Sequence, residues 1–339
     1  MNNYTTYIFG AGASANSIPT IDGLPEAFKI IAKCISGDIK GKRLNEYKNV
    51  PDSDIQSLKS IADDIAKLEQ LSADYGTIDT YFKKLYLNNE VEETRKLKQA
   101  MSFFFYLWQN PQHPFPKGME KDILWKKIDL RYIGLLSNIL IANDGFPKWN
   151  DKFRILTWNY DFQIIKAFQS LSSKNAAEII ADYSIYPLND TSDEKLNEPN
   201  IIYLNGISGA HYFKNKVELE GKKENIYEFY KQFKEANRLE LINFAWEWKK
   251  NDISKKAVEA ARLVMKNTQN LVIVGYSFPY YNFEIDRDVL KSLPPEAKIY
   301  YQDYNADLDT FTRRFEFLNR ENIKILNTEI SLRQFYIPL

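Results

Sequence analysis

The sequence predicts an α/β fold in which helices cover a doubly wound parallel sheet. Short apolar runs that suit buried strands alternate with longer stretches of helical periodicity, a pattern typical of parallel sheets with right-handed crossovers. The run at 270–274 is continuously apolar, as expected of a central strand that is covered on both faces. With 339 residues, the chain can bury a large core and form one big domain or two smaller ones.

The first predicted strand, at 7–9, leads directly into a loop of small residues at 10–14. Small residues let a phosphate approach the backbone N–H groups, which is the logic of a dinucleotide-binding first turn. The loop reads GAGAS and lacks the third glycine of the G-x-G-x-x-G fingerprint, because position 15 is Ala. Glycines after a strand also serve plain packing, so both roles are open.

Helical periodicity dominates the chain between the first and second strands. A first helix is expected from about Leu24, helices fill most of 52–110, with Thr77 as a cap, and a long helix is expected over 121–143. More than a hundred residues is far longer than a plain crossover. The sequence therefore predicts a helical insertion at about 52–145 within an α/β scaffold.

A second block of helices is expected at about 223–266, over 225–249 and 254–266. With no flexible linker visible between the blocks, the sequence predicts one domain over 1–339 that carries both insertions. The single cysteine, Cys34, lies in an apolar helical pattern and is expected to be a buried thiol. One cysteine excludes an internal disulfide framework and a cysteine-cluster zinc site.

The charge balance bears on the classes of partner. Lys and Arg together number 45 and so do Asp and Glu, whereas a dedicated duplex-DNA binder normally carries a basic excess. No apolar run approaches the ~20 residues of a bilayer span, and the N-terminus does not resemble a signal peptide. We expect a soluble, cytoplasmic protein that binds neither membranes nor, directly, nucleic acid.

Small or polar residues follow each of the strands predicted at 153–157, 200–204, 270–274 and 298–302. They are Asn159 and Asp161, Asn205 and Gly206, Gly275 and Ser277, and Asp303. Because the carboxyl ends of parallel strands lie at one edge of a sheet, these residues predict a crevice for a polar, phosphorylated, ribose-bearing ligand. Asp161 also suits the cap of the helix that follows it.

These motifs give the chain a resemblance to the sirtuin family, specifically to the bacterial sirtuin-like branch that hydrolyses NAD in antiviral defence. The resemblance is carried by GAGAS at 10–14, by TWNYD at 157–161, which matches the family's T-x-N-x-D, and by GYSF at 275–278. Order and spacing fit across nearly the whole chain. The resemblance implies a Rossmann-like fold, and the absence of the family's zinc-binding cysteines favours the hydrolase branch over protein deacetylation.

The resemblance also implies that NAD is bound as a substrate and that no metal is needed. The binding residues that it implies are Gly10, Ala11, Gly12 and Ser14 for the pyrophosphate, Asp161 for the nicotinamide side, and Gly275, Ser277 and Asp303 for the adenosine side. Asn159 is expected to orient a water molecule or the nicotinamide ribose. Cleaving the C1′–N bond of NAD requires mainly positioning and electrostatic stabilisation, which these residue types can supply.

The chain departs from the family at one strand end. The family's L-H-G reads Leu204-Asn205-Gly206 here, and an amide can hydrogen-bond a ribose hydroxyl but cannot accept its proton at neutral pH. His211, six residues further on, is either a substitute for that histidine or a loop residue. The candidate catalytic residues are therefore Asn159, Asn205 and His211.

Three functions are compatible with these observations. The first is an NAD glycohydrolase that releases nicotinamide and ADP-ribose, kept silent until a separate sensor protein or homo-oligomerisation activates it, with the helical insertions as docking surfaces. The second is a catalytically inactive subunit that binds NAD or ADP-ribose. The third, a Rossmann oxidoreductase, requires an acidic residue about twenty positions after the glycine loop and a second strand there, where the chain instead continues as a helix.

Overall fold

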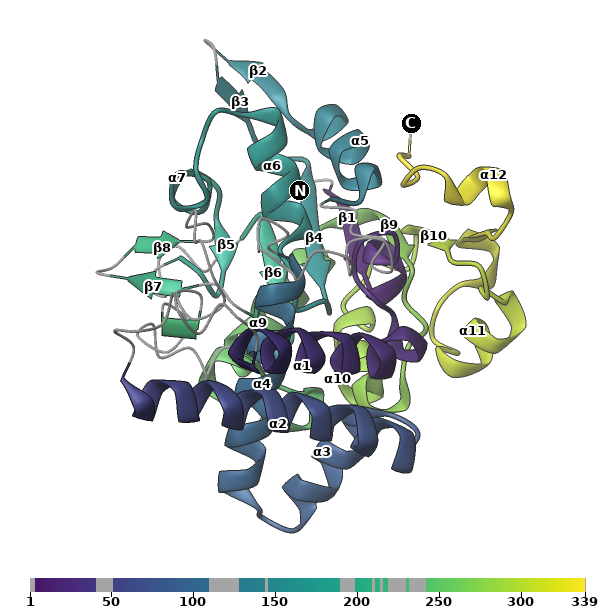
Figure 1. The fold of residues 1–339 in the computed structure, drawn as a ribbon. Helices are drawn as coiled ribbons and strands as arrows, with labels where there is room; N and C mark the ends of the chain where they lie inside the picture. The colour runs from purple at the N-terminus through teal and green to yellow at the C-terminus, as the bar shows by residue number, and fades with distance from the viewer. Residues whose placement is uncertain are drawn as a thin grey trace. The chain divides into compact units, whose positions relative to one another are not determined.

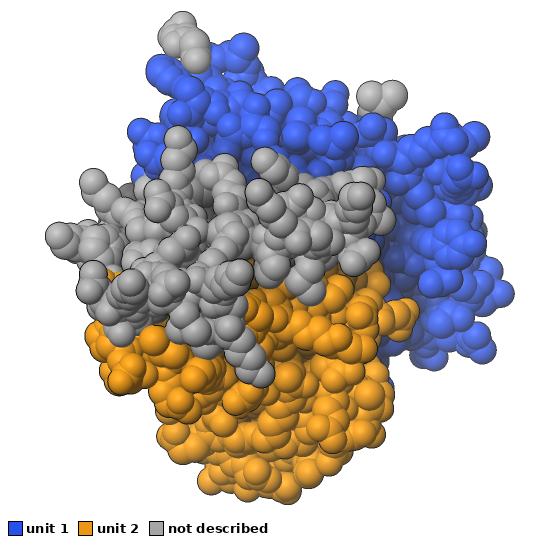
Figure 2. Space-filling view, in the orientation of Figure 1, with its two compact units in different colours: residues 1–16, 128–207, 243–339 blue, residues 17–127, 208–242 orange. Residues whose placement is uncertain are grey.

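The computed structural model describes residues 4–40, 51–109, 128–143, 146–189, 199–208, 211–213, 216–218, 230–231 and 242–338. The chain divides into two compact units, coloured separately in Figure 2. Unit 1 comprises residues 1–16, 128–207 and 243–339, and unit 2 comprises residues 17–127 and 208–242.

Unit 1 is built on a parallel sheet of seven strands among the described residues, in the order β11-β10-β9-β1-β4-β6-β5. Every neighbouring pair in it is parallel. The strands are β1 (Tyr4–Phe9), β4 (Phe153–Thr157), β5 (Ile185–Tyr186), β6 (Ile201–Tyr203), β9 (Thr268–Val274), β10 (Lys298–Gln302) and β11 (Ile323–Leu326). The predicted α/β class with a parallel, doubly wound sheet is confirmed.

The order of the strands reverses beside β1. From β1 the chain continues to β4, β5 and β6 on one side, then crosses to β9, β10 and β11 on the other. Loops that leave β1 and β9 therefore run in opposite directions. In open α/β sheets such a switch point, at the carboxyl ends of the strands, is where ligands bind.

Helices cover both faces of this sheet (Figure 1). Successive strand residues point to opposite faces, so Ile8, Leu156 and Ile273 share one core with helices α9 (Asp252–Lys266) and α10 (Phe283–Leu290). The other helices of unit 1 are α5 (Leu130–Ile139), α6 (Gln163–Leu171), α7 (Ala176–Asp182), α11 (Leu308–Arg314) and α12 (Glu329–Leu332). On the opposite face, the Phe9 ring packs edge-on against Tyr132 of α5, with ring centroids 5.2 Å apart.

Unit 2 is mainly helical in its described residues. It contains α1 (Leu24–Lys40), α2 (Asp52–Asp74), α3 (Ile78–Leu87), α4 (Val91–Gln109) and the hairpin of β7 (His211–Phe213) and β8 (Lys216–Glu218). Phe28 of α1 meets Phe104 of α4 edge-to-face, with centroids 4.5 Å apart, and Cys34 is buried as predicted. The Thr77 hydroxyl accepts a hydrogen bond from the Thr80 N–H and caps α3, also as predicted.

The helix predicted over 121–143 is confirmed by α5 over Leu130–Ile139 and is wrong after that point. The chain beyond Ile139 forms the antiparallel hairpin of β2 (Ile141–Asn143) and β3 (Phe146–Lys148). Leu140 is already extended, with ψ of 140°. The apolar spacing continues past this point, but the Asn-Asp-Gly sequence that follows favours a turn over a helix. Residues 121–127 lie outside the described residues.

The helix predicted over 225–249 lies mostly outside the described residues, and its described end differs from the prediction. Ala245–Glu247 is a single 3₁₀ turn, η6, in which the Trp246 ring stacks on Phe244 with centroids 4.8 Å apart. The short edge strand β5 was missed, because a two-residue run followed by Pro187 gives no strand signal. The predicted helix over 254–266 is confirmed by α9.

The predicted insertions overlap unit 2 at 52–127 and 223–242, whereas residues 128–145 and 243–266 belong to unit 1. The organisation as one domain stays a prediction. No helix among the described residues is long and apolar enough to cross a bilayer.

Candidate functional site

The loop after β1 packs backbone to backbone against the loop after β9. The Gly10 N–H donates to Val274 O at 3.0 Å, and the Gly12 N–H donates to Gly275 O at 2.8 Å. An added Cβ would lie 2.7 Å from the Gly275 Cα at position 12, and 2.3 Å from the Ala13 nitrogen at position 275. Gly275 also has a φ of +58°, which disfavours any other residue. Glycine is therefore required here for close packing, one of the two roles that the sequence left open.

This packing occupies several amides of the loop. The N–H groups of Gly10 and Gly12 donate to β9 and to its loop, and the Ala13 N–H donates to Gly10 O at 2.9 Å. Ala11 is exposed at the start of the short 3₁₀ turn over Ala11–Ser14. Three of the N–H groups that the phosphate-binding hypothesis would use are thus engaged within the protein, and the pyrophosphate-binding role of the loop stays a prediction.

Ser14 joins the ends of β1 and β4 through its buried hydroxyl. Its Oγ lies 3.0 Å from the Tyr132 hydroxyl and accepts a hydrogen bond from Asn159 Nδ2 at 3.2 Å. The same Nδ2 donates to Gly10 O at 2.9 Å, and the Ser14 hydroxyl lowers the pKa of the Asp161 carboxyl group. Ser14, proposed from one strand end, therefore bonds Asn159 and interacts with Asp161, both proposed from a strand end that is distant in the sequence.

Asp161 is a buried carboxyl group with a raised pKa. Its Oδ1 accepts the Gln163 N–H at 3.0 Å, so it also caps α6, as the sequence suggested. Its pKa is raised from 3.8 to about 6: burial is the main cause and repulsion by Asp129 adds to it, while the Ser14 hydroxyl, the Gln163 N–H and the charge of Lys166 act in the opposite direction. The side chain can therefore change its charge near neutral pH.

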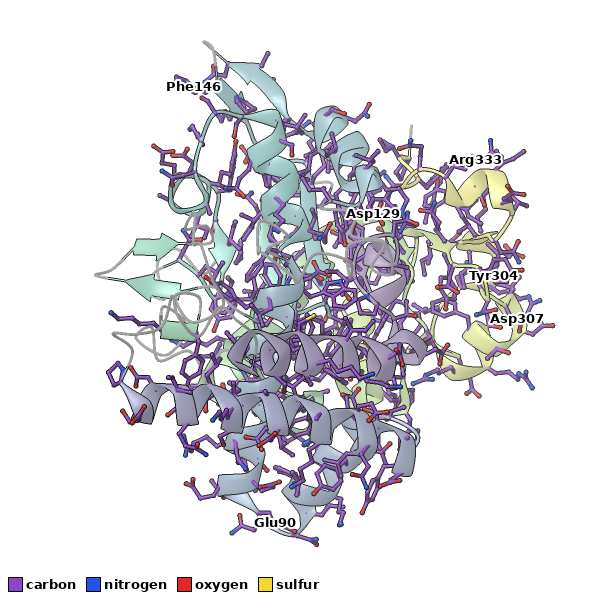
Figure 3. The ribbon with its side chains drawn as sticks, in the orientation of Figure 1. Glu90, Asp129, Phe146, Tyr304, Asp307 and Arg333 are labelled. Carbon is purple, nitrogen blue, oxygen red and sulfur yellow. The ribbon has the colours of Figure 1, made fainter. Side chains whose placement is uncertain are left out.

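Asp129 and Arg131 hold the loop from the side of α5, and neither was predicted from the sequence. Asp129, labelled in Figure 3, is buried and accepts hydrogen bonds from the Arg131 guanidinium, with 2.6 Å at the shortest. The same terminal nitrogen of that guanidinium also donates to Gly12 O at 3.0 Å and to Ala13 O at 3.1 Å. The available signal was Asp129 as the cap of α5, which a prediction of one continuous helix concealed.

The end of β6 carries two buried polar atoms without a hydrogen-bond partner among the described residues, Asn205 Oδ1 and the Tyr203 hydroxyl. The Asn205 Nδ2 donates weakly to the Tyr160 hydroxyl at 3.4 Å, and the backbone carbonyl of Asn205 accepts the Asn243 N–H at 2.8 Å. Burial and the nearby Asp161 carboxylate raise the pKa of Tyr203 well above its usual value. Tyr203 did not follow from the sequence, because it lies inside a strand rather than after one.

Of the remaining predicted residues, Ser277 and Asp303 follow the strands β9 and β10 of the same sheet, whereas His211 does not belong to it. Ser277 is exposed just after β9, and Asp303 is half-buried after β10, where it accepts the Asn305 N–H at 2.8 Å. Tyr304, labelled in Figure 3, is exposed beside it. His211 begins β7 in unit 2, and its side chain lies outside the described residues, so its role as a substitute base stays a prediction.

A second buried network supports the site from the α10 side of the sheet. Both carboxylate oxygens of Asp286 accept from the Tyr276 hydroxyl, at 3.0 and 2.9 Å, and the Trp158 side chain lowers the pKa of Asp286, which burial raises well above its usual value. The rings of Trp158 and Tyr276 stack with centroids 5.9 Å apart. Since these residues adjoin Asn159 and Gly275, the network ties together the loops after β4 and β9.

The site thus combines a fixed amide, a titratable carboxyl group and several buried hydroxyls. Among the described residues, no group of three or more His, Cys, Asp or Glu side chains could hold a metal ion. Comparison of the chain with models of known families, with curated proteins and with solved structures gave no match in any of the three.

Proposed function

We propose that this protein is an NAD⁺ glycohydrolase, which cleaves NAD to nicotinamide and ADP-ribose. The observation that carries the proposal is the cluster of Ser14, Asn159 and Asp161 at the carboxyl ends of β1 and β4, in which Asn159 donates to Ser14 Oγ and Ser14 lowers the pKa of Asp161. The set lies next to the reversal of strand order, where open α/β sheets bind nucleotides. It also unites two of the three motifs on which the resemblance to the sirtuin family rests.

The chemistry of this reaction suits the residues at the site. Breaking the C1′–N bond releases a leaving group that is already cationic and passes through a state with positive charge on the ribose. Such a reaction depends on positioning and on negative or dipolar groups rather than on a strong nucleophile. Asn159, held through its Nδ2 by Gly10 O and Ser14 Oγ, is the group that orients a water molecule or the ribose. Asp161, ionised above about pH 6, supplies negative charge on the nicotinamide side.

A second candidate function is an inactive subunit that binds NAD or ADP-ribose, and Asn205 favours it. The Oδ1 of Asn205 is buried and has no hydrogen-bond partner among the described residues. It can therefore accept a hydrogen bond that a ribose hydroxyl donates. An amide cannot, however, take the proton of that hydroxyl at neutral pH. The glycohydrolase function therefore requires a water molecule or another base at this position. The function as an inactive binding subunit does not.

The proposed role in the cell follows from the resemblance. Cleavage of NAD depletes a cofactor that every cell requires, so the activity has to be silent until infection. We propose that a separate sensor protein or homo-oligomerisation provides this control. The helical unit 2 is the candidate docking region, because it contains much of the two insertions that the sequence predicts.

The test is release of nicotinamide from NAD by the full chain, assayed over a range of protein concentrations that allows homo-oligomers to form. Asn159→Ala should lower the rate by at least ~100-fold, the scale of a lost orienting group. The matched control is Asn138→Ala, which removes an exposed amide from α5 in the same unit and should leave the rate unchanged.

If the activity requires an activator, the same variants are compared in cells. NAD levels are then measured in cells that express each variant and are infected with a phage. Thermal stabilisation by NAD without nicotinamide release in either setting would select the inactive subunit. The absence of both stabilisation and release would refute the proposal.

A further inference from the structure

Strand β6 places Tyr203 next to the start of the TWNYD motif, which contains Asp161. In the parallel register of β4 and β6, Tyr203 is paired with Thr157, the first residue of the TWNYD motif. The Thr157 hydroxyl accepts the Asn159 N–H at 3.1 Å, so the motif begins directly next to Tyr203. Burial and, after it, electrostatic repulsion by Asp161 raise the pKa of Tyr203. Tyr203 and Asp161 therefore interact electrostatically within unit 1.

Tyr203 is only 1% exposed, yet its hydroxyl has no hydrogen-bond partner among the described residues. Leaving such a donor unsatisfied costs on the order of the desolvation of a hydroxyl, so buried tyrosines usually find a partner. Other buried tyrosines of unit 1 do so: Tyr7, Tyr132, Tyr186, Tyr276 and Tyr301. An unpaired hydroxyl beside the proposed reaction centre points to a group that arrives from outside the protein.

We propose that the Tyr203 hydroxyl binds the substrate, donating a hydrogen bond to the carboxamide oxygen of the nicotinamide ring. This assignment rests on the proposed NAD glycohydrolase function. A primary carboxamide carries an acceptor oxygen and a donor NH₂ group side by side. Tyr203 offers the complementary donor, and Asp161 offers the complementary acceptor.

Asp161 retains the capacity for this role. A carboxylate has about four lone-pair positions, and the hydrogen bond from the Gln163 N–H uses one of them. Its remaining positions suit the NH₂ group of the carboxamide. Tyr203 then determines which pyridine ring is accepted, because rings without a carbonyl cannot use its hydrogen bond.

The test compares Tyr203→Phe with wild type in the full chain. Binding of NAD and of two analogues, measured by titration calorimetry, separates the two halves of the carboxamide. The 3-acetylpyridine analogue keeps the carbonyl oxygen but lacks the NH₂ group, and the analogue with an unsubstituted pyridine lacks both. Tyr203→Phe should weaken NAD and the acetylpyridine analogue by roughly 5- to 10-fold, the scale of one hydrogen bond, and should leave the unsubstituted analogue unchanged.

Thermal unfolding of the free protein supplies the second arm. Because its hydroxyl has no partner to lose among the described residues, Tyr203→Phe should keep the melting temperature of wild type or raise it. Tyr132→Phe is the matched control, since it removes a hydroxyl that bonds Ser14 and should lower the melting temperature.

Two results would overturn the assignment while leaving the glycohydrolase proposal intact. One is a melting temperature of Tyr203→Phe that falls as far as that of Tyr132→Phe, which would place the hydroxyl on an internal partner such as an ordered water. The other is that Tyr203→Phe weakens the binding of all three dinucleotides equally, while the wild type releases nicotinamide from NAD. A wild type that neither binds nor cleaves NAD would instead refute the proposed function, and with it the ligand assigned to Tyr203.

Discussion

Replacing Asp161 by Asn should stabilise the protein at neutral pH, because the buried carboxylate is costly there. Burial raises the pKa of Asp161 from 3.8 to about 6, whereas the unfolded chain ionises near 3.8. The folded state therefore binds the proton more tightly. Its contribution to stability is full below pH 3.8 and is lost as the pH rises through the window from 3.8 to 6.

The pKa of Asp161 is 3.8 in the unfolded chain and about 6 in the folded state. At about 1.4 kcal/mol for each pH unit between these two values, ionisation of Asp161 removes about 3 kcal/mol from the free energy of unfolding. The amide in Asp161→Asn would keep an oxygen for the Gln163 N–H and can donate from its NH₂ group to Ser14 Oγ, so few bonds are lost. Relative to wild type, Asp161→Asn should gain about 2 kcal/mol in free energy of unfolding between about pH 4 and pH 7.

Urea unfolding at four pH values, from about pH 4 to about pH 7, measures this difference. Asp151→Asn, an exposed change next to β4, is the matched control and should show no such gain. If the free-energy difference between Asp161→Asn and wild type is independent of pH, the raised pKa is wrong. If Asp161→Asn is less stable than wild type at neutral pH, the carboxylate is worth more to the fold than its burial costs.

Two further predictions concern the loops that carry the site. Gly275→Ala should destabilise the protein by about 2 to 4 kcal/mol in thermal unfolding, since the new Cβ would meet backbone atoms 2.3 Å away at a φ of +58°. The control is Gly37→Ala in α1, where nothing lies within 4 Å of the added Cβ; it should stabilise the protein by up to about 1 kcal/mol. An equal effect of both changes would contradict the role of Gly275 in loop packing. Tyr276→Phe should cost about 1 to 3 kcal/mol, because it leaves the Asp286 carboxyl buried without its tyrosine donor; unchanged unfolding in urea would show that this bond contributes nothing.

The class of fold could be predicted from the amino-acid sequence alone, because that information is local. Continuous apolar runs such as 270–274 suit strands covered on both faces, and helices such as α2 and α9 carry their apolar residues at helical spacing. Local reasoning failed where two patterns compete. The apolar spacing at 130–143 continues through the end of α5, but the turn-forming residues after it produce a hairpin.

The candidate site was likewise predicted only in part from the sequence. Ser14, Asn159 and Asp161 could be proposed from the sequence, since each follows a predicted strand and parallel strands end at one edge. Only the tertiary structure showed that Gly12 and Gly275 are needed for contact between two loops. The two glycines lie far apart in the sequence, and nothing in either local sequence indicates the other.

The partners of the site residues were likewise decided by the tertiary structure. Tyr132 and Arg131 reach Ser14 and its loop from α5, and Asp286 reaches Tyr276 from α10. These contacts depend on how helices pack over the two faces of the sheet. Hydrogen bonding and burial at the site are properties of that packing. A strand pattern predicts that a residue lies at the end of a strand but not which residues its side chain contacts.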